Sequence, residues 1–185
     1  MTAFQAVVLL WLGSELLIGL THLAPVGSRR EDRFSGPVLI VFLLSATWLG
    51  TIVARRDPAS QIVFGHSFVY GLGIALVLAG IALRWYAVIT LGRFFTTRVR
   101  TSPGQHVITS GPYKFVRHPS YTGMLLTVLG ILLCLTNWLS LACFLIALPG
   151  FAYRIRVEER ALANALGDPY RDYMRRTKRL VPFVI

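Results

Sequence analysis

The sequence predicts an all-α, polytopic membrane protein with about five transmembrane helices and a cytoplasmic helical tail. Hydrophobic residues make up 55% of the 185-residue chain and charged residues only 15%, whereas charged residues reach ~25% in soluble domains. The apolar residues form long runs, and the basic residues lie between and after these runs. This arrangement is typical of a chain that crosses a bilayer several times.

The first half of the chain contains three apolar runs. A helix needs about 20 residues to cross the apolar core of a bilayer. Residues 3–24 meet this length and are interrupted only by Glu15 and His22; residues 37–54 begin with Pro37, a residue favoured in the first turn of a helix. Residues 66–91 form the third run, with Arg84 near its end.

The second half predicts a helical hairpin and a polar tail. The apolar runs 121–135 and 138–153 are shorter, and only Thr136 and Asn137 separate them. Residues 154–166 are rich in good helix formers, Gly167 supplies a stop, and a short helix is expected from Asp168 to Arg176. We therefore expect one membrane domain over residues 1–185: three helices in 1–91, a loop over 92–120, a hairpin over 121–153 and a tail over 154–185.

The positions of lysine and arginine predict the orientation. With five crossings, the segments 26–36, 92–120 and the tail from residue 154 share one side, and they hold three, five and eight basic residues. The opposite side holds only Arg55 and Arg56. Basic loops stay in the cytoplasm, so the long loop and the C-terminus are expected there. Of the 19 basic residues only Lys114 and Lys178 are lysine. Such a preference for arginine is typical of GC-rich bacterial genomes, so we expect a bacterial protein, located in the inner membrane.

The net charge of +11 also permits binding to nucleic acid. The basic residues, however, do not alternate with apolar ones along amphipathic elements, so membrane lipids and an anionic ligand are the better partners. Cys134 and Cys143 lie within apolar runs, and the sequence has no spacing typical of a metal site. We expect neither a metal nor a disulfide.

Polar residues concentrate in the two stretches 104–121 and 154–173. His118 precedes Pro119 at the N-terminus of a membrane helix, where unpaired backbone N–H groups can bind an anion. The alternative is that Arg117 and His118 only anchor the helix to lipid headgroups. Arg154 and Glu158 are spaced i, i+4 and share a helix face. They form either a surface ion pair or part of a functional site, because unpaired charge is costly near the apolar boundary.

Together these stretches resemble the isoprenylcysteine carboxyl methyltransferase family, and related phospholipid methyltransferases are similar. The resemblance rests on G-P-Y-x-x-x-R-H-P-x-Y-x-G at residues 111–123, E-E-x-x-L at 158–162 and G-x-x-Y-x-x-Y at 167–173. It covers roughly residues 91–182. It implies a small helical membrane enzyme that uses S-adenosylmethionine and releases S-adenosylhomocysteine.

The resemblance also implies the site residues. Arg154 matches the residue that meets the substrate carboxylate, and Glu158 matches an acid that binds the cofactor. The remaining matches to cofactor-lining positions are Gln105, His106, Val107, Ile108, Tyr113, His118, Pro119, Ser120 and Tyr121, with a looser match at Arg98. His118 is in addition the first candidate for a catalytic base, should the acceptor need one.

The reaction expected is in-line methyl transfer to a carboxylate or other oxygen of a lipophilic, isoprenoid-like substrate. The alternatives are a phenolic or polyketide lipid hydroxyl, with His118 as base, and a phospholipid amine, for which Glu158 or Glu159 is expected near the acceptor nitrogen. A non-enzymatic lipid-binding scaffold with an inactive site is the alternative from another class of protein.

Overall fold

The computed structural model describes residues 2–21, 29–30, 32–97, 100–101 and 104–181. Its long helices are α1 (Ala3–Thr21), α2 (Ser35–Arg56), α3 (His66–Leu91), α4 (Pro119–Cys134) and α6 (Phe144–Leu166); α5 (Trp138–Ala142) and α7 (Asp168–Arg176) are short. The connections contain the 3-10 turns η1 (Pro58–Ser60), η2 (Gly92–Phe94) and η3 (Gly111–Lys114) and the antiparallel pair β1 (Arg29–Arg30) and β2 (Arg100–Thr101). The predicted all-α fold class is confirmed.

The bundle has the length and surface of an integral membrane protein. Within the described ranges, α1, α2, α3 and the combined span of α5 and α6 are long and apolar enough to cross a membrane, and α4 is a shorter apolar helix of 16 residues. Large apolar side chains such as Leu9, Leu16 and Trp48 are exposed on its outside. In water such a surface would aggregate, whereas in lipid it is the expected exterior.

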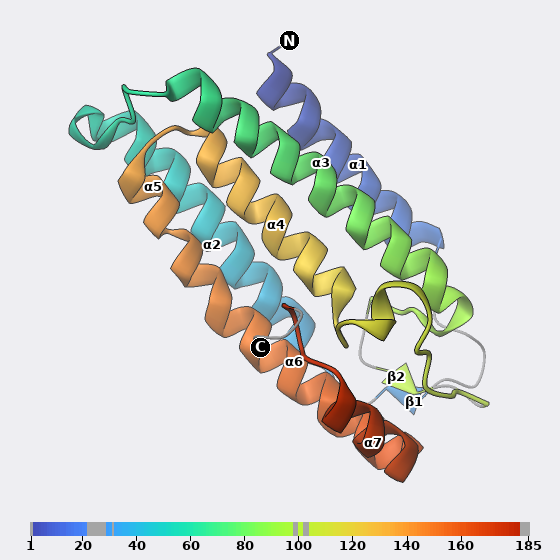
Figure 1. The fold of residues 1–185 in the computed structure, drawn as a ribbon. Coiled ribbons are helices and arrows are strands. Elements are labelled where there is room, and N and C mark those ends of the chain that lie inside the picture. The colour runs from blue at the N-terminus through green and yellow to red at the C-terminus, as the bar shows by residue number, and fades with distance from the viewer. Residues whose placement is uncertain (1, 22–28, 31, 98–99, 102–103, 182–185) are drawn as a thin grey trace.

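The long helices run side by side, and the chain starts at one end of the bundle (Figure 1). The opposite end carries β1 and β2, the segment after α3, the start of α4 and helix α7 (Figure 1). The described parts of the three basic segments therefore meet at one end, as predicted. We call this the basic end.

Helix α2 begins two residues before the expected Pro37. The carboxylate of Asp32 accepts hydrogen bonds from the backbone N–H of Ser35 (2.8 Å) and from its hydroxyl (2.6 Å). This side-chain acceptor satisfies a backbone donor at the helix start, which extends the helix toward the loop. Residues 22–24, which the sequence assigned to the first helix, lie outside the described residues.

The second helix of the hairpin does not end near Tyr153 as predicted. The structure divides the run 138–153 at Cys143 into α5 and α6, and α6 continues past Tyr153 to Leu166, where Gly167 adopts a φ of 65° and ends it. The apolar composition stops at Tyr153, but the helix formers that follow continue the same hydrogen-bond ladder. As a result Arg154 and Glu158 lie on a rigid helix that leaves the apolar layer.

Helices α3 and α4 approach each other closely through glycine pairs. A Cβ placed on Gly80 would lie 2.5 Å from the carbonyl oxygen of Gly123, and one on Gly73 would lie 2.8 Å from that of Gly130. Gly71, on the same helix, has open space around it. The small-residue pattern therefore serves packing within the chain at Gly73 and Gly80, and it holds the start of α4 against α3 at the basic end.

Candidate active site

A cavity of about 290 Å³ lies at the basic end and is lined by residues from α1, α2, α3, α4, α6, α7 and the segment after α3. Its volume is close to the lower end of the roughly 300–1,000 Å³ typical of small-molecule sites. The residues of the predicted site that line it are Gln105, His106, Val107, Ile108, Tyr113, His118, Ser120, Tyr121, Arg154 and Glu158. Pro119 does not line it but is buried as the first residue of α4, and Arg98 lies outside the described residues.

Arg154 is buried in the wall of this cavity and is fixed by three neighbouring segments. Its Nε donates to the hydroxyl of Tyr121 (2.9 Å), Nη1 to the hydroxyl of Ser35 (2.7 Å) and Nη2 to the carbonyl of Thr97 (3.0 Å). The carboxylate that it contacts within the described segments, that of Asp32, is 3.9 Å away. The cation is thus held firmly by neutral groups, and its charge is only loosely compensated.

Asp32 stays ionised in this position. Burial acts to raise the pKa of Asp32, but the hydrogen bonds from Ser35 outweigh it and hold that pKa below its usual range. The same carboxylate therefore starts α2 and keeps Ser35 in place for Arg154.

Glu158 lies one helical turn after Arg154 and also lines the cavity. Its carboxylate accepts a hydrogen bond from the hydroxyl of Tyr121, the same hydroxyl that accepts from Arg154. No ion pair of Glu158 is formed within the described part of the chain. The two charges of the i, i+4 pair are therefore not a surface ion pair: Tyr121 separates and orients them inside a cavity.

A second arginine of the cavity comes from within the membrane helices. Arg84 on α3 forms an ion pair with Glu15 on α1, and its Nη1 donates to the hydroxyl of Ser120 (2.8 Å). All three residues line the cavity. In the sequence, Glu15 and Arg84 stand out only as charged residues that interrupt apolar runs. Ionisable residues at such depth are costly unless paired and functional, and that signal could have assigned both to the site.

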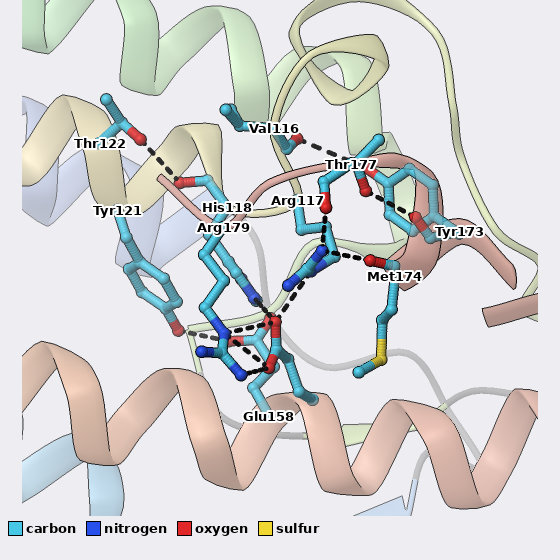
Figure 2. Close-up of polar contacts among 11 residues, drawn as sticks. Val116, Arg117, His118, Tyr121, Thr122, Glu158, Tyr173, Met174, Thr177 and Arg179 are labelled. Carbon is cyan, nitrogen blue, oxygen red and sulfur yellow. Dashed lines mark hydrogen bonds and ion pairs between the residues drawn. The ribbon is translucent and has the colours of Figure 1, made fainter. Parts of the chain in front are cut away.

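Glu159, the neighbour of Glu158, has a different environment. Its carboxylate accepts from Nε of Arg117 (2.9 Å) and from Nε of Arg179 (3.0 Å), and it lies 3.3 Å from Nε2 of His118. These three side chains thus share the carboxylate of Glu159, and Figure 2 shows them pointing toward the same region of α6, next to the labelled Glu158. Glu159 does not line the cavity, so it is not placed to meet an amine acceptor there.

The C-terminal segment closes this cluster. The backbone N–H groups of Arg117 and His118 donate to the carbonyls of Lys178 (2.8 Å) and Arg179 (3.0 Å), and the hydroxyl of Thr122 donates to that of Leu180 (2.7 Å). Residues 177–180 therefore lie against the start of α4. Neither Arg117 nor His118 anchors the chain to headgroups, because both side chains are buried in these contacts.

Aromatic side chains form another part of the wall. Tyr113 is buried, its hydroxyl points to the carbonyl of Ala87 (3.4 Å), and its own carbonyl accepts from the hydroxyl of Tyr173 (2.7 Å). Burial raises the pKa of Tyr113 well above its usual value and that of Tyr173 to about 12. Both are neutral phenols at physiological pH, which suits stacking and hydrogen bonding and excludes a role as anionic bases.

The segment before η3 completes the cavity opposite α6. Gln105, Val107 and Ile108 are partly buried, and the more exposed His106 contacts Phe94 edge to face with ring centroids 5.2 Å apart. Apolar and amide groups of this kind fit a planar heterocycle better than a charged group.

Comparison with known proteins identifies the family. Residues 73–164 match the family model described as the isoprenylcysteine carboxyl methyltransferase family. Protein-S-isoprenylcysteine O-methyltransferase B of Arabidopsis thaliana is 33% identical over 144 residues, which cover 74% of this chain and 73% of that protein. The uncharacterized protein YpbQ of Bacillus subtilis is 33% identical, with 66% of this chain and 68% of that protein covered.

A solved structure agrees with the sequence relatives. The eukaryotic intramembrane Ras methyltransferase, an isoprenylcysteine carboxyl methyltransferase, matches with a TM-score of 0.65 and 28% identity over 80% of this chain. This chain covers 53% of that one, and 48% of the Saccharomyces cerevisiae protein-S-isoprenylcysteine O-methyltransferase, to which it is 37% identical. The chain thus spans about half the length of these two proteins. It belongs to the isoprenylcysteine carboxyl methyltransferase family, which confirms the resemblance and the class of enzyme predicted from its motifs.

Proposed function

We propose that this protein transfers a methyl group from S-adenosylmethionine to the carboxylate of a lipophilic, isoprenoid-like substrate. In this proposal the basic end faces the cytoplasm, because most lysine and arginine residues gather there. The membrane is a bacterial inner membrane, because arginine strongly outnumbers lysine in the chain. Its relatives named protein-S-isoprenylcysteine O-methyltransferase support the carboxylate acceptor.

One observation carries the proposal: among the described residues, a single cavity holds a carboxylate with no ion-pair partner and a cation whose ion-pair partner is distant. Glu158 accepts only from Tyr121 among its described contacts, and Arg154 is 3.9 Å from Asp32. Buried or half-buried charges left in this state favour ligands that supply the missing partner. A cationic cofactor beside Glu158 and an anionic acceptor beside Arg154 satisfy both at once.

The residues present fit S-adenosylmethionine. Glu158 suits its ammonium or ribose hydroxyls, and the rings of Tyr113 and Tyr121 suit the adenine or the sulfonium through stacking and cation–π contact. The segment of Gln105 to Ile108 supplies apolar and amide groups for the base. When bound, the cofactor supplies an electrophilic methyl group on a sulfonium.

The chain's own contribution is to hold the acceptor and to exclude water. A carboxylate is already a nucleophile and needs no base. Arg154 has a fixed guanidinium that can orient such a carboxylate, and correct placement supplies most of the rate in reactions of this kind. Leu39, Ile40 and Met124 line the cavity beside it, which provides an apolar wall for a lipid chain and keeps the reaction dry.

The other acceptors find less support. An amine headgroup requires a carboxylate near the acceptor nitrogen. Glu159 is neutralised by Arg117 and Arg179 outside the cavity, and Glu158, which lines the cavity, is assigned to the cofactor in this proposal. A phenolic lipid requires a base, and His118 is the candidate because its ring lines the cavity. The ring, however, already contacts Glu159 through Nε2.

The decisive experiment incubates purified protein in nanodiscs with S-adenosylmethionine labelled in its methyl group and a small prenylated cysteine with a free carboxylate. The matched control acceptor carries an amide in place of that carboxylate. Label is expected in the acid and in no product of the amide. Calorimetric titration with S-adenosylhomocysteine distinguishes the enzyme from a non-enzymatic lipid-binding scaffold. Binding without turnover points to another acceptor, which a native lipid extract would then reveal. Absence of binding contradicts the proposal that the protein is a methyltransferase.

A further inference from the structure

A second hollow, of about 340 Å³, lies on the surface between the end of α7 and the C-terminal segment. Five cationic side chains line it: Arg117, Arg175, Arg176, Lys178 and Arg179. It shares only Arg117 with the cavity described above, and the proposed methyl transfer makes no use of it.

The charge of this hollow is only partly compensated. Glu159 is the acidic partner of Arg117 and Arg179, and Asp172 is that of Arg175. Arg176 and Lys178 are exposed and form no ion pair with any residue that the structure describes. Five cations therefore face two carboxylates, and the remaining positive charge attracts an anion.

The backbone carbonyl groups that would repel such an anion already accept hydrogen bonds. The carbonyls of Met174 and Thr177, at the end of α7, both accept from Nη1 of Arg117. The carbonyl of Lys178 accepts from the backbone N–H of Arg117. The negative end of the helix is thus occupied by one buried guanidinium, so the exposed cations around it are not drawn onto these oxygens.

The position of the hollow indicates the source of the anion. The segment that forms it is hydrogen-bonded through Leu180 to Thr122, in the first turn of the apolar helix α4. Two apolar side chains beside it are exposed, Phe115 (57%) and Val181 (46%), and Val116, next to Phe115, pairs with Lys178. Aromatic and apolar side chains next to cations at the end of a membrane helix mark the headgroup layer.

We propose that this hollow binds the phosphate of an anionic phospholipid of the adjoining leaflet, with Arg176 and Lys178 as its principal contacts. Phe115 and Val181 enter the lipid beside it. Because the same segment holds Arg117 and His118 through Lys178 and Arg179, the bound lipid also stabilises the C-terminal segment against the wall of the active-site cavity.

The test titrates the purified full-length chain, in zwitterionic micelles, with short-chain phosphatidylglycerol and separately with phosphatidylcholine of the same chain length. The thermal unfolding midpoint and the number of lipids retained in native mass spectrometry are measured. Arg176→Gln/Lys178→Gln is compared with Arg156→Gln/Arg160→Gln, which removes two exposed charges from the same end of the bundle but outside the hollow.

Phosphatidylglycerol, and not phosphatidylcholine, is expected to raise the midpoint and to be retained by the wild type and by the Arg156/Arg160 variant. The Arg176/Lys178 variant should bind it about 30-fold more weakly, since it lacks two cations that contribute about 1 kcal/mol each near an anionic surface, and about 1.4 kcal/mol corresponds to a factor of ten. Equal loss in both variants reduces the effect to general surface charge and overturns the proposal. An equal rise with inorganic phosphate at the same concentration also overturns it, because the site would then serve a soluble anion.

Discussion

Arg154 and Glu158 lie one turn apart on α6, yet the hydroxyl of Tyr121 stands between them, accepting from the arginine and donating to the carboxylate. A direct ion pair would neutralise both groups. The tyrosine instead leaves each charge able to meet a ligand of opposite sign. The pattern of charges on α6 is therefore completed by a residue from α4.

The first prediction concerns this bridge. Tyr121→Phe removes both hydrogen bonds and keeps the ring. It should weaken S-adenosylhomocysteine binding and lower kcat together, because Glu158 and Arg154 both lose an orienting partner. Calorimetry and steady-state kinetics measure the two effects, and unchanged values for both would show that the bridge has no functional role.

The second prediction separates the roles of the two charges. Glu158→Gln should weaken binding of S-adenosylhomocysteine about tenfold or more, in line with the loss of a hydrogen bond to a charged group. Arg154→Gln should leave this affinity largely intact and reduce turnover of the carboxylate acceptor. If Arg154→Gln abolishes cofactor binding instead, the proposed division of roles is wrong.

The third prediction uses the adjacent glutamates as a matched pair. Glu159→Gln leaves Arg117, Arg179 and His118 around a neutral amide, so the C-terminal segment should open more often. Hydrogen exchange at the amides of Arg117 and His118, which donate to Lys178 and Arg179, should become faster. Glu158→Gln should leave exchange at these two amides unchanged. Equal acceleration by both variants would contradict the separate environments of the two acids.

The fourth prediction concerns the ion pair inside the membrane helices. Glu15→Ala leaves Arg84 buried without its carboxylate, a change that costs about 3–5 kcal/mol when a buried pair is broken. Glu15→Ala/Arg84→Met removes the unpaired charge and should recover part of the lost stability. Thermal unfolding in detergent checks this order, and a double variant less stable than the single one would contradict it.

The fifth prediction tests the packing of α3 on α4. Gly80→Ala places a Cβ 2.5 Å from the carbonyl of Gly123 and should lower stability by roughly 1–3 kcal/mol, as overpacking does. Gly71→Ala, on the same helix and with nothing within 4 Å, is the control and should be neutral. A fall in the unfolding midpoint of the Gly80 variant alone is the expected result.

Much of the fold and of the site can be predicted because its signals are local. Long apolar runs indicate the membrane helices, and proline and glycine residues mark where helices start and stop. The asymmetric distribution of basic residues indicates the basic end. Tyr113, His118, Tyr121 and Glu158 stand in motifs whose spacing is visible in the sequence. The apolar composition predicts an end of the last membrane helix at residue 153, whereas α6 continues to Leu166, because composition changes at residue 153 while helix propensity does not.

The amino-acid sequence alone indicates a helical membrane protein with two polar motifs at one end. Which charges in those motifs are available to a ligand depends on how the helices pack. Glu158 and Glu159 are chemically identical neighbours, but α6 turns one into the cavity and the other toward Arg117 and Arg179. Likewise, Glu15 and Arg84 become a pair only when α1 packs on α3. Charge compensation depends on distances between segments far apart in the chain, and spacing along the sequence does not encode those distances.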